Sequence, residues 1–249
     1  MTSLPVYIED WAAFSPGLSS KADWQAWASG QTPSSDTLQA PVDTIPPMLR
    51  RRLSPLGKMA LAVVFPLLRE NEQLPCVFCS RHGELTRTVK LLTELTEDEP
   101  LSPTQFSLSV HNAIGGVLSI ARKDTSCISA LAVDDRDSSA AVMETAAILA
   151  EQDAERALCV FYDDEVPQVY LDTGAPRHHP FALALLLNRQ PGAGHTLQLS
   201  LDSTGADNPQ PREPQPLSLL RFLLTDDVSG LQLPGSHINW HWTKTGGTA

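Results

Sequence analysis

The chain has 249 residues, of which 42% are hydrophobic and 19% charged, a composition typical of globular proteins with one large or two small cores. Its formal net charge of −11 argues against sequence-independent binding of DNA or RNA, which needs a basic surface to displace phosphate counterions. No long apolar run predicts a membrane span, and the first residues lack the basic flank of a secretory signal, so we expect a cytoplasmic protein.

The N-terminal part of the chain predicts a strand, a short helix and a loop. Residues 6–17 indicate a strand followed by a turn. Residues 20–27 predict a helix that begins with the capping residue Ser20. Residues 30–47 are rich in Pro, Ser and Thr, and they predict a loop.

The next part of the chain begins an alternation of helices and strands. Residues 45–70 have helical periodicity, with breaks or kinks expected at Pro55 and Pro66. A short buried strand at 74–80 and an amphipathic helix at 83–95 follow. The strand contains the CxxC pair Cys76 and Cys79, a pattern also found at redox and metal sites. We interpret it as two reduced core cysteines, because the strand is apolar and no second CxxC exists.

The central part of the chain continues this alternation. Ser102 and Pro103 predict the start of a helix that continues to residue 122, and its Gly-Gly pair permits close packing. A strand at 126–133, a helix at 138–152 and a strand at 156–166 follow. This order predicts an α/β fold with helices layered around a largely buried sheet.

The C-terminal part differs from what precedes it. Residues 180–188 and 195–203 predict two strands, which we expect to form a hairpin through the loop QPGAG. A proline-rich linker, a short helix and a terminal apolar strand are predicted next, at residues 204–216, 217–224 and 238–242. Neither a metal site nor a cofactor site is expected, since no histidines have i, i+4 spacing on a predicted helix, no HExxH pattern occurs and no phosphate-binding motif is present.

The segment from Ser102 to Val133, followed by an Ala-rich helix and LCVFYDD, resembles the N-terminal half of β-ketoacyl synthases of the thiolase fold. The residues that match this family are Ser102, Pro103, Phe106, Ser109, Asn112 and Gly116. With IEDWAAFSPG, MLRRRLSPLGKMAL and VFCSRHGE, the chain is similar to β-ketoacyl synthase-like N-terminal domain proteins. These are chain-length-factor-like partners encoded with type II polyketide and aryl polyene pathways.

The resemblance covers about residues 6–190 and implies a truncated thiolase-like fold, the N-terminal half, with helices around a mixed sheet. It implies a ketosynthase-like domain at residues 1–195 and a C-terminal extension at residues 196–249. The part that remains after the resemblance is too short to supply the second, catalytic half of the fold.

Condensing enzymes of this family carry a cysteine at the elbow after the strand, where the helix N-terminus favours the thiolate. Here the nucleophile-equivalent position falls near Asp134 and Asp135, and Cys127 lies about eight residues too early. A carboxylate can accept hydrogen bonds from helix amides but is a poor acyl acceptor. The resemblance therefore implies no catalytic residue, and the simplest alternative is that the acidic residues only cap the helix.

The resemblance further implies that residues 126–133 pair with an active ketosynthase, in a heterodimer or a dimer of heterodimers. The residues implied at the partner interface and acyl pocket are His111, Asn112, Cys127, Ile128, Ser129, Ala130 and Leu131. Acyl carrier proteins are acidic and prefer basic patches, so we expect this acidic chain to meet the carrier only indirectly, with Arg50–Arg52 as the one basic exception.

Two other functions remain open from the sequence. The chain could be an acyltransferase or thioesterase that uses Cys127, Ser138 or Ser139 as nucleophile together with His111. It could also be a scaffold that binds several pathway enzymes without contacting an acyl pocket.

Overall fold

The computed structural model describes residues 3–32, 39–43, 45–134, 136–173, 179–203 and 213–245. Within these residues one mixed sheet has eight strands in the order β3-β2-β4-β5-β1-β6-β8-β7. The strands are β1 (Ser3–Phe14), β2 (Cys76–Ser80), β3 (Ile128–Ala132), β4 (Arg156–Asp163), β5 (Phe181–Asn188), β6 (His195–Asp202), β7 (Gly230–Pro234) and β8 (Asn239–Lys244).

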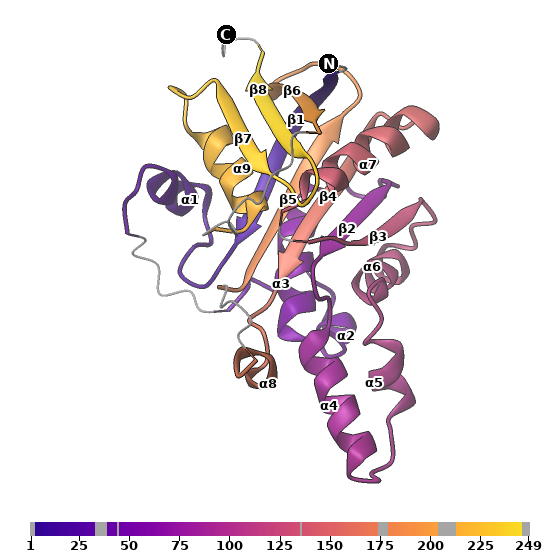
Figure 1. The fold of residues 1–249 in the computed structure, drawn as a ribbon. Coiled ribbons are helices and arrows are strands. Elements are labelled where there is room, and N and C mark those ends of the chain that lie inside the picture. The colour runs from indigo at the N-terminus through magenta and orange to yellow at the C-terminus, as the bar shows by residue number, and fades with distance from the viewer. Residues whose placement is uncertain are drawn as a thin grey trace.

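Helices lie on both faces of this sheet (Figure 1). They are α1 (Lys21–Ala28), α2 (Pro47–Arg50), α3 (Pro55–Val64), α4 (Leu85–Thr96), α5 (Pro103–Ser107), α6 (Ala113–Arg122), α7 (Ser139–Glu151), α8 (Gln168–Leu171) and α9 (Gln215–Leu224), with the 3-10 helix η1 (Phe65–Leu67). The predicted α/β class, with helices layered around a mixed sheet, is confirmed. No helix in the described ranges combines the length and apolar character needed to span a bilayer.

The sheet separates two hydrophobic cores. Along β4, Cys159 and Phe161 pack into the core beneath α1, α7 and α9, whereas Leu158 and Val160 pack into the core beneath α3 and α6. This alternation is the two-residue period of a strand that is covered on both faces. Burial also raises the pKa of Cys159 to about 12, so this thiol is protonated and unreactive at neutral pH.

The same alternation along β2 places the two cysteines of the CxxC pair on opposite faces of the sheet. Cys76 belongs to the core beneath α3 and α6, and Cys79 belongs to the core beneath α7. Both thiols are buried, and burial raises the pKa of each. Among the described residues no cluster of His, Cys, Asp and Glu could hold a metal ion.

The helix starts predicted at Ser20 and Ser102 are confirmed, and Ser54 provides a further cap that was not predicted. The side chain of Ser20 accepts a hydrogen bond from the backbone N–H of Asp23, whose carboxylate accepts one from the backbone N–H of Ser20. The side chain of Ser102 accepts a hydrogen bond from the backbone N–H of Gln105 at the start of α5, and that of Ser54 accepts one from Gly57 at the start of α3, each with proline at the next position. The prolines at 55 and 66 also divide the predicted helix at 45–70 into α2, α3 and η1.

The predicted hairpin between residues 180–188 and 195–203 is wrong. β1 lies between β5 and β6 and pairs with both in antiparallel register, its N-terminal half with β6 and its C-terminal half with β5. The loop that links β5 to β6 passes close to β1 at Gly194, where a Cβ atom would lie 2.3 Å from the carbonyl oxygen of Ile8. Gly194 also has φ of +122°, so both space and backbone conformation require glycine there.

The structure departs from two further predictions. The single helix expected at 102–122 is two helices, α5 and α6, separated by residues 108–112. β7 was not predicted and pairs with β8 at the far end of the sheet. The domain boundary at residue 195 stays a prediction, although β6, β8 and β7 continue the same sheet as the preceding strands.

Candidate functional site

The carboxyl ends of the three parallel strands β3, β2 and β4 meet at one end of the sheet, where α/β proteins commonly place their sites. The Asp163 carboxylate accepts hydrogen bonds from the hydroxyl of Ser80 at 2.8 Å and from the backbone N–H of Arg81 at 3.0 Å. The hydroxyl oxygen of Ser80 in turn accepts the backbone N–H of Gly83 at 2.8 Å. These contacts fix the turn after β2 beside the end of β4.

The predicted elbow lies at this end of the sheet, between the last residue of β3 and the first residue of α7. Asp134 accepts hydrogen bonds from the backbone N–H of Arg136 at 3.2 Å and from its Nε at 3.1 Å. Asp135, the other nucleophile-equivalent position, lies outside the described residues. Asp134 therefore forms a local ion pair with Arg136, and in the described chain its carboxylate accepts no hydrogen bond from an α7 amide.

The C-terminal segment covers the rest of the elbow, and we call its residues Gln215, Gly235, Ser236, Trp240 and Trp242 the C-terminal clamp. The Nε1–H of Trp240 donates to the Asp137 carboxylate at 3.2 Å, and the backbone N–H of Ser236 donates to the same carboxylate at 3.4 Å. The Nε1–H of Trp242 donates to the hydroxyl oxygen of Ser139 at 3.0 Å. The elbow is thus cross-linked to β8 by side chains more than a hundred positions away in the sequence.

Gln215 and Gly235 complete the C-terminal clamp. The hydroxyl of Ser138 donates to Oε1 of Gln215 at 3.3 Å, and Nε2 of Gln215 donates to the carbonyl oxygen of Pro234 at 2.9 Å. A Cβ atom at Gly235 would lie 2.1 Å from the carbonyl oxygen of Ile238 and 2.6 Å from Oδ1 of Asp137. Glycine is required here because the turn between β7 and β8 approaches the elbow so closely.

The candidate nucleophiles of the alternative enzyme do not meet a base. Ser138 and Ser139 are 6% and 2% exposed, and their side-chain hydrogen bonds are to Gln215 and Trp242. Cys127 precedes β3, at the opposite end of that strand from the elbow. His111 Nε2 lies 3.0 Å from the carbonyl oxygen of Leu131, so this imidazole is bonded to the backbone of β3. The geometry therefore does not bring these residues together as a nucleophile and its base.

β3 forms one end of the sheet and, in the described chain, pairs only with β2. Its residues from Ile128 to Leu131 are half-buried, and Ala132 is exposed. Cys127 and Leu131 pack toward the α7 side and Ile128 toward the α6 side, which is the two-residue period of a strand. The outer edge of β3 therefore offers backbone N–H and C=O groups to a further strand.

Large apolar side chains are exposed on α6, which packs against β3, and on α5, which packs against α4. Phe106 on α5 is 63% exposed and Ile120 on α6 is 71% exposed, and Val110 in the connection between these helices is also exposed. α6 packs against β3 through Gly115, where a Cβ atom would lie 2.7 Å from the Ile128 side chain. Val110 and Ile120 were not predicted, and Phe106 was named only as a family match, although an apolar residue among polar neighbours was a signal.

The two other sequence-predicted interface residues lie where α5 leads into α6. His111 is half-buried and contacts Gly83, at which a Cβ atom would lie 2.7 Å from the imidazole Nδ1. Asn112 is exposed at the N-cap position of α6, and its side chain makes no cap hydrogen bond. Asn112 is therefore not a core residue, and its side chain faces solvent in the isolated chain.

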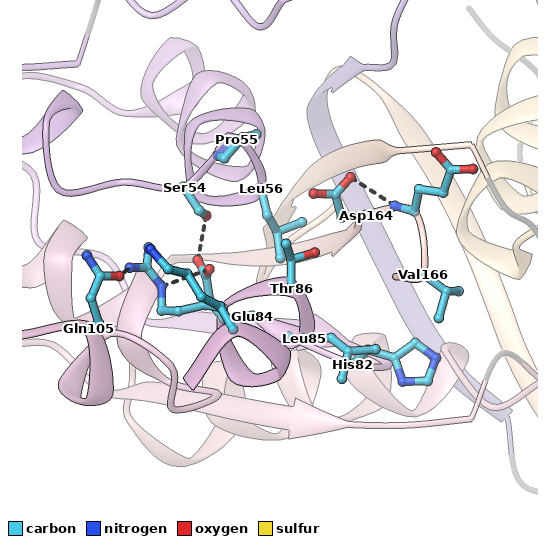
Figure 2. A pocket seen from close by; sticks show the side chains of 14 residues that line it. Ser54, Pro55, Leu56, His82, Glu84, Leu85, Thr86, Gln105, Asp164 and Val166 are labelled. Atoms are coloured by element: carbon cyan, nitrogen blue, oxygen red, sulfur yellow. Dashed lines mark hydrogen bonds and ion pairs between the residues drawn. The ribbon is translucent and has the colours of Figure 1, made fainter. Parts of the chain in front are cut away.

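A separate cavity of about 290 Å³ lies among the start of α3, the turn after β2, α4 and the residues that follow β4 (Figure 2). On one wall the buried Glu84 accepts a hydrogen bond from the hydroxyl of Ser54 at 2.6 Å and one from Nε of Arg87 at 3.2 Å, and Arg87 also donates to Gln105. On the other wall burial raises the pKa of Asp164. The elbow residues do not line this cavity, which the turn at Gly83 separates from His111.

Residues 24–243 match the family model described as "Beta-ketoacyl synthase, N-terminal domain". A search of curated proteins found no match. Among solved structures, the chain is similar to one chain in a ketosynthase in complex with its chain length factor from Xenorhabdus doucetiae. That match has 32% identity and a TM-score of 0.79, and it covers 96% of this chain and 99% of the other.

Two more distant solved structures share the fold. The ishigamide ketosynthase/chain length factor has 14% identity and a TM-score of 0.61, and the match covers 80% of this chain and 67% of the other. A type II PKS acyl-carrier protein in complex with its ketosynthase bound to the hexaketide gives 14% identity and a TM-score of 0.58, with 75% of this chain and 64% of the other covered. These similarities confirm that the fold is thiolase-like and that this chain spans only part of such larger chains.

Proposed function

We propose that this chain, which belongs to the β-ketoacyl synthase N-terminal domain family, is a non-catalytic, chain-length-factor-like subunit of a ketosynthase. In this role it pairs with an active ketosynthase, stabilises it and shapes the acyl pocket of that partner. The pathway class that we propose is type II polyketide biosynthesis of the aryl polyene kind. The similar chain from Xenorhabdus doucetiae belongs to a complex of the same two kinds of subunit.

The observation that carries the proposal is the state of the elbow. A condensing subunit needs a reactive thiolate there, open to an acyl thioester. In this chain Asp134 and Asp137 occupy the described part of the elbow, and the serines that follow are buried under the C-terminal clamp. A carboxylate would repel the charged extender unit of such a reaction, and the tryptophan contacts close the approach.

The outer edge of β3 supports the pairing. An unpaired strand edge can extend the sheet of another chain by backbone hydrogen bonds, and the small residues Ser129 and Ala130 allow the two backbones to approach closely. The exposed side chains of Phe106 and Ile120 then become buried against the partner. Burial of apolar surface stabilises association by roughly 25 cal/mol per Å² before the costs of association are subtracted.

The selection of chain length would follow from side chains near this edge. We propose that His111 and Asn112, together with Val110 and Phe106, lie against the end of the partner's acyl tunnel. The His111 side chain is held by the carbonyl of Leu131 and by the close contact at Gly83, so under this proposal it forms a rigid part of the tunnel end. Each methylene that such a wall admits or excludes changes binding by roughly 0.8 kcal/mol.

Co-expression with a ketosynthase tests this proposal. We expect both chains to elute as one stoichiometric complex, and we expect the ketosynthase to be soluble and active only in that complex. Incubation of the complex with radiolabelled acyl carrier protein should label the ketosynthase and leave this chain unlabelled. A stable covalent acyl group on this chain would favour the acyltransferase alternative. If the length of the product stays the same when Phe106 and Val110 are substituted, the result would favour a scaffold.

A further inference from the structure

The cavity beside α4, which we call the α4 cavity, has the size of a small-molecule site and has no part in the proposed function. Its volume is about 290 Å³, near the lower end of the range of such sites, roughly 300–1,000 Å³. It therefore suits a ligand the size of an aromatic ring with a short side chain. The buried side chains of Leu56 and Val166 and the half-buried side chain of Leu85 give it apolar walls.

One side of the α4 cavity carries a guanidinium group in a fixed position. The Arg87 side chain is only 12% exposed, and its Nε donates to the Glu84 carboxylate at 3.2 Å while its Nη1 donates to Gln105. Glu84 is held in turn by the hydroxyl of Ser54 at 2.6 Å. In the described chain Nη2 of Arg87 has no hydrogen-bond partner, and this atom is not sealed in the protein interior. A guanidinium edge held in this way is a binding group for a carboxylate.

A second cation lines the same side of the cavity. Lys90 lies one turn after Arg87 on α4, so the two side chains can approach the same anion. Nζ of Lys90 lies 3.7 Å from Glu94 and the lysine side chain is 70% exposed, so this ion pair is weak. Because Glu84 neutralises Arg87, Lys90 supplies the net positive charge on this side.

The other side of the α4 cavity carries an acceptor. Figure 2 shows Gln105 and Glu84 on one side of Leu56 and Asp164 on the other. In the described chain the one hydrogen bond to the Asp164 carboxylate comes from the backbone N–H of Glu165 at 2.8 Å, and no cation pairs with it. Burial raises the pKa of this carboxyl group, so a hydroxyl donor from a ligand would compensate for its lost solvation.

We propose that the α4 cavity binds a small free carboxylic acid that has an apolar body and a hydroxyl group at the end remote from the carboxylate. The carboxylate contacts Arg87 and Lys90. The apolar body lies against Leu56 and Val166, and the hydroxyl donates to Asp164. An amine fits less well, because the cationic side of the cavity repels it. A carrier-bound thioester lacks the carboxylate, so this ligand is distinct from the acyl chain of the proposed function, and the inference does not depend on that function.

The test is calorimetric titration of the full chain with three probes that share one skeleton. They are para-hydroxyphenylpropanoate, phenylpropanoate, which lacks the hydroxyl, and tyramine, which has an ammonium group in place of the carboxylate. We expect the hydroxy acid to bind about fivefold more tightly than phenylpropanoate, because loss of the hydroxyl leaves Asp164 without its donor. Tyramine should not bind measurably.

Variants of the cavity assign each contact. Arg87→Lys keeps a charge beside Glu84 but removes the forked donor, so the Kd of the hydroxy acid should rise about tenfold. Lys90→Met should raise it about threefold, and the matched control Lys21→Met, at an exposed position away from the cavity, should leave it unchanged. With Asp164→Ala the two acids should bind equally. Circular dichroism and thermal unfolding verify that the variants are folded, and the exposed Lys90→Met keeps the test decisive if Arg87→Lys does not fold.

Three outcomes would overturn the proposal: neither acid binds the wild-type chain, Lys90→Met and Lys21→Met have the same effect, or tyramine binds more tightly than the acids. If Asp164→Ala still prefers the hydroxy acid, the position assigned to the hydroxyl is wrong. Failure of the proposed function would leave all of these results unchanged, since no step of the titration involves a ketosynthase.

Discussion

The elbow after β3 and the outer edge of β3 are only a few residues apart, yet their polar groups are used in opposite ways. At the elbow the side chains of Asp137, Ser138 and Ser139 are all bonded within the chain, mainly to the C-terminal clamp. Along the edge, the backbone of Ile128–Ala132 has a strand partner on one side alone in the described chain. Under the proposed function a catalytic subunit needs an open elbow, whereas a pairing subunit needs an open edge. In the described chain the elbow side chains are bonded internally and β3 has a strand partner on one side.

The largest effect is expected from a proline at the edge. Ala130→Pro removes one backbone N–H and restricts the strand, so it should abolish co-purification with the ketosynthase. The control is Gln232→Pro in β7, the strand at the other end of the sheet, and this variant should still co-purify. If both variants are folded and both bind the ketosynthase, pairing does not use the edge of β3.

The next largest effect is expected from a methyl group in the turn of the C-terminal clamp. Gly235→Ala places a Cβ atom against the carbonyl of Ile238 and the Asp137 carboxylate, so the free energy of unfolding should fall by about 1–3 kcal/mol. Gly230→Ala is the control, since its Cβ atom would make only an ordinary contact at 3.8 Å. Urea unfolding measures the free energy of unfolding of both variants. Equal decreases would contradict the close contact between the turn and the Asp137 carboxylate.

A smaller effect isolates one hydrogen bond between the elbow and β8. Trp242→Phe removes the donor to the Ser139 hydroxyl, and Ser139→Ala removes the acceptor. A double-mutant cycle should give a coupling energy of about 1 kcal/mol between these buried groups. Additive effects of the two substitutions would contradict the contact.

The smallest effect is expected at the ion pair between Glu72 and Arg156, which lies far from the elbow. It is a reference site, because its loss should change stability without changing the elbow or the edge of β3. Burial alone would raise the pKa of Glu72, but hydrogen bonds from Arg156 and from the backbone of Arg69 lower it below its ordinary value of 4.5. Because the folded pKa is lowered, this contribution to stability is present above pH 4.5 and is lost as the pH falls through the folded pKa.

The loss of stability caused by Glu72→Gln should therefore be present at pH 7 and shrink in acid. Thermal unfolding across this pH range measures it, with the exposed Glu151→Gln as the control. The binding of the ketosynthase at pH 7 should be the same for both variants. A loss that stays constant with pH would show that the carboxylate charge does not matter.

Local patterns predicted most of the elements before β7. Serine followed by proline marked the start of α5, the proline at 55 marked a break that is the start of α3, and short apolar runs marked β2 and β4 as buried strands. The position of β1 between β5 and β6 was not predictable in the same way, because strand order depends on pairing across the whole chain. A short loop between two apolar strands favours a hairpin, and nothing local reports that a third strand separates them.

The candidate site shows the same limit. The strand predicted at 126–133 and the helix predicted at 138–152 are β3 and α7, so the position of the turn that contains Asp134 was predictable from local patterns. The C-terminal clamp was missed, since no spacing rule links Trp240 to Asp137 across such a long stretch of sequence. β7 was missed because Leu231 and Leu233 are its only large apolar residues, which is too short an alternation to predict a strand.

The outer edge of β3, which has no strand partner among the described residues, also affects how the protein behaves in a cell. A strand with unsatisfied backbone groups is a template for self-association, so copies made in excess of the ketosynthase should aggregate or form homodimers that compete with the productive assembly. Balanced synthesis of the two chains would suppress this side reaction. We therefore expect the yield of soluble protein in recombinant cells to follow the molar ratio of the two chains more closely than the expression level of either one.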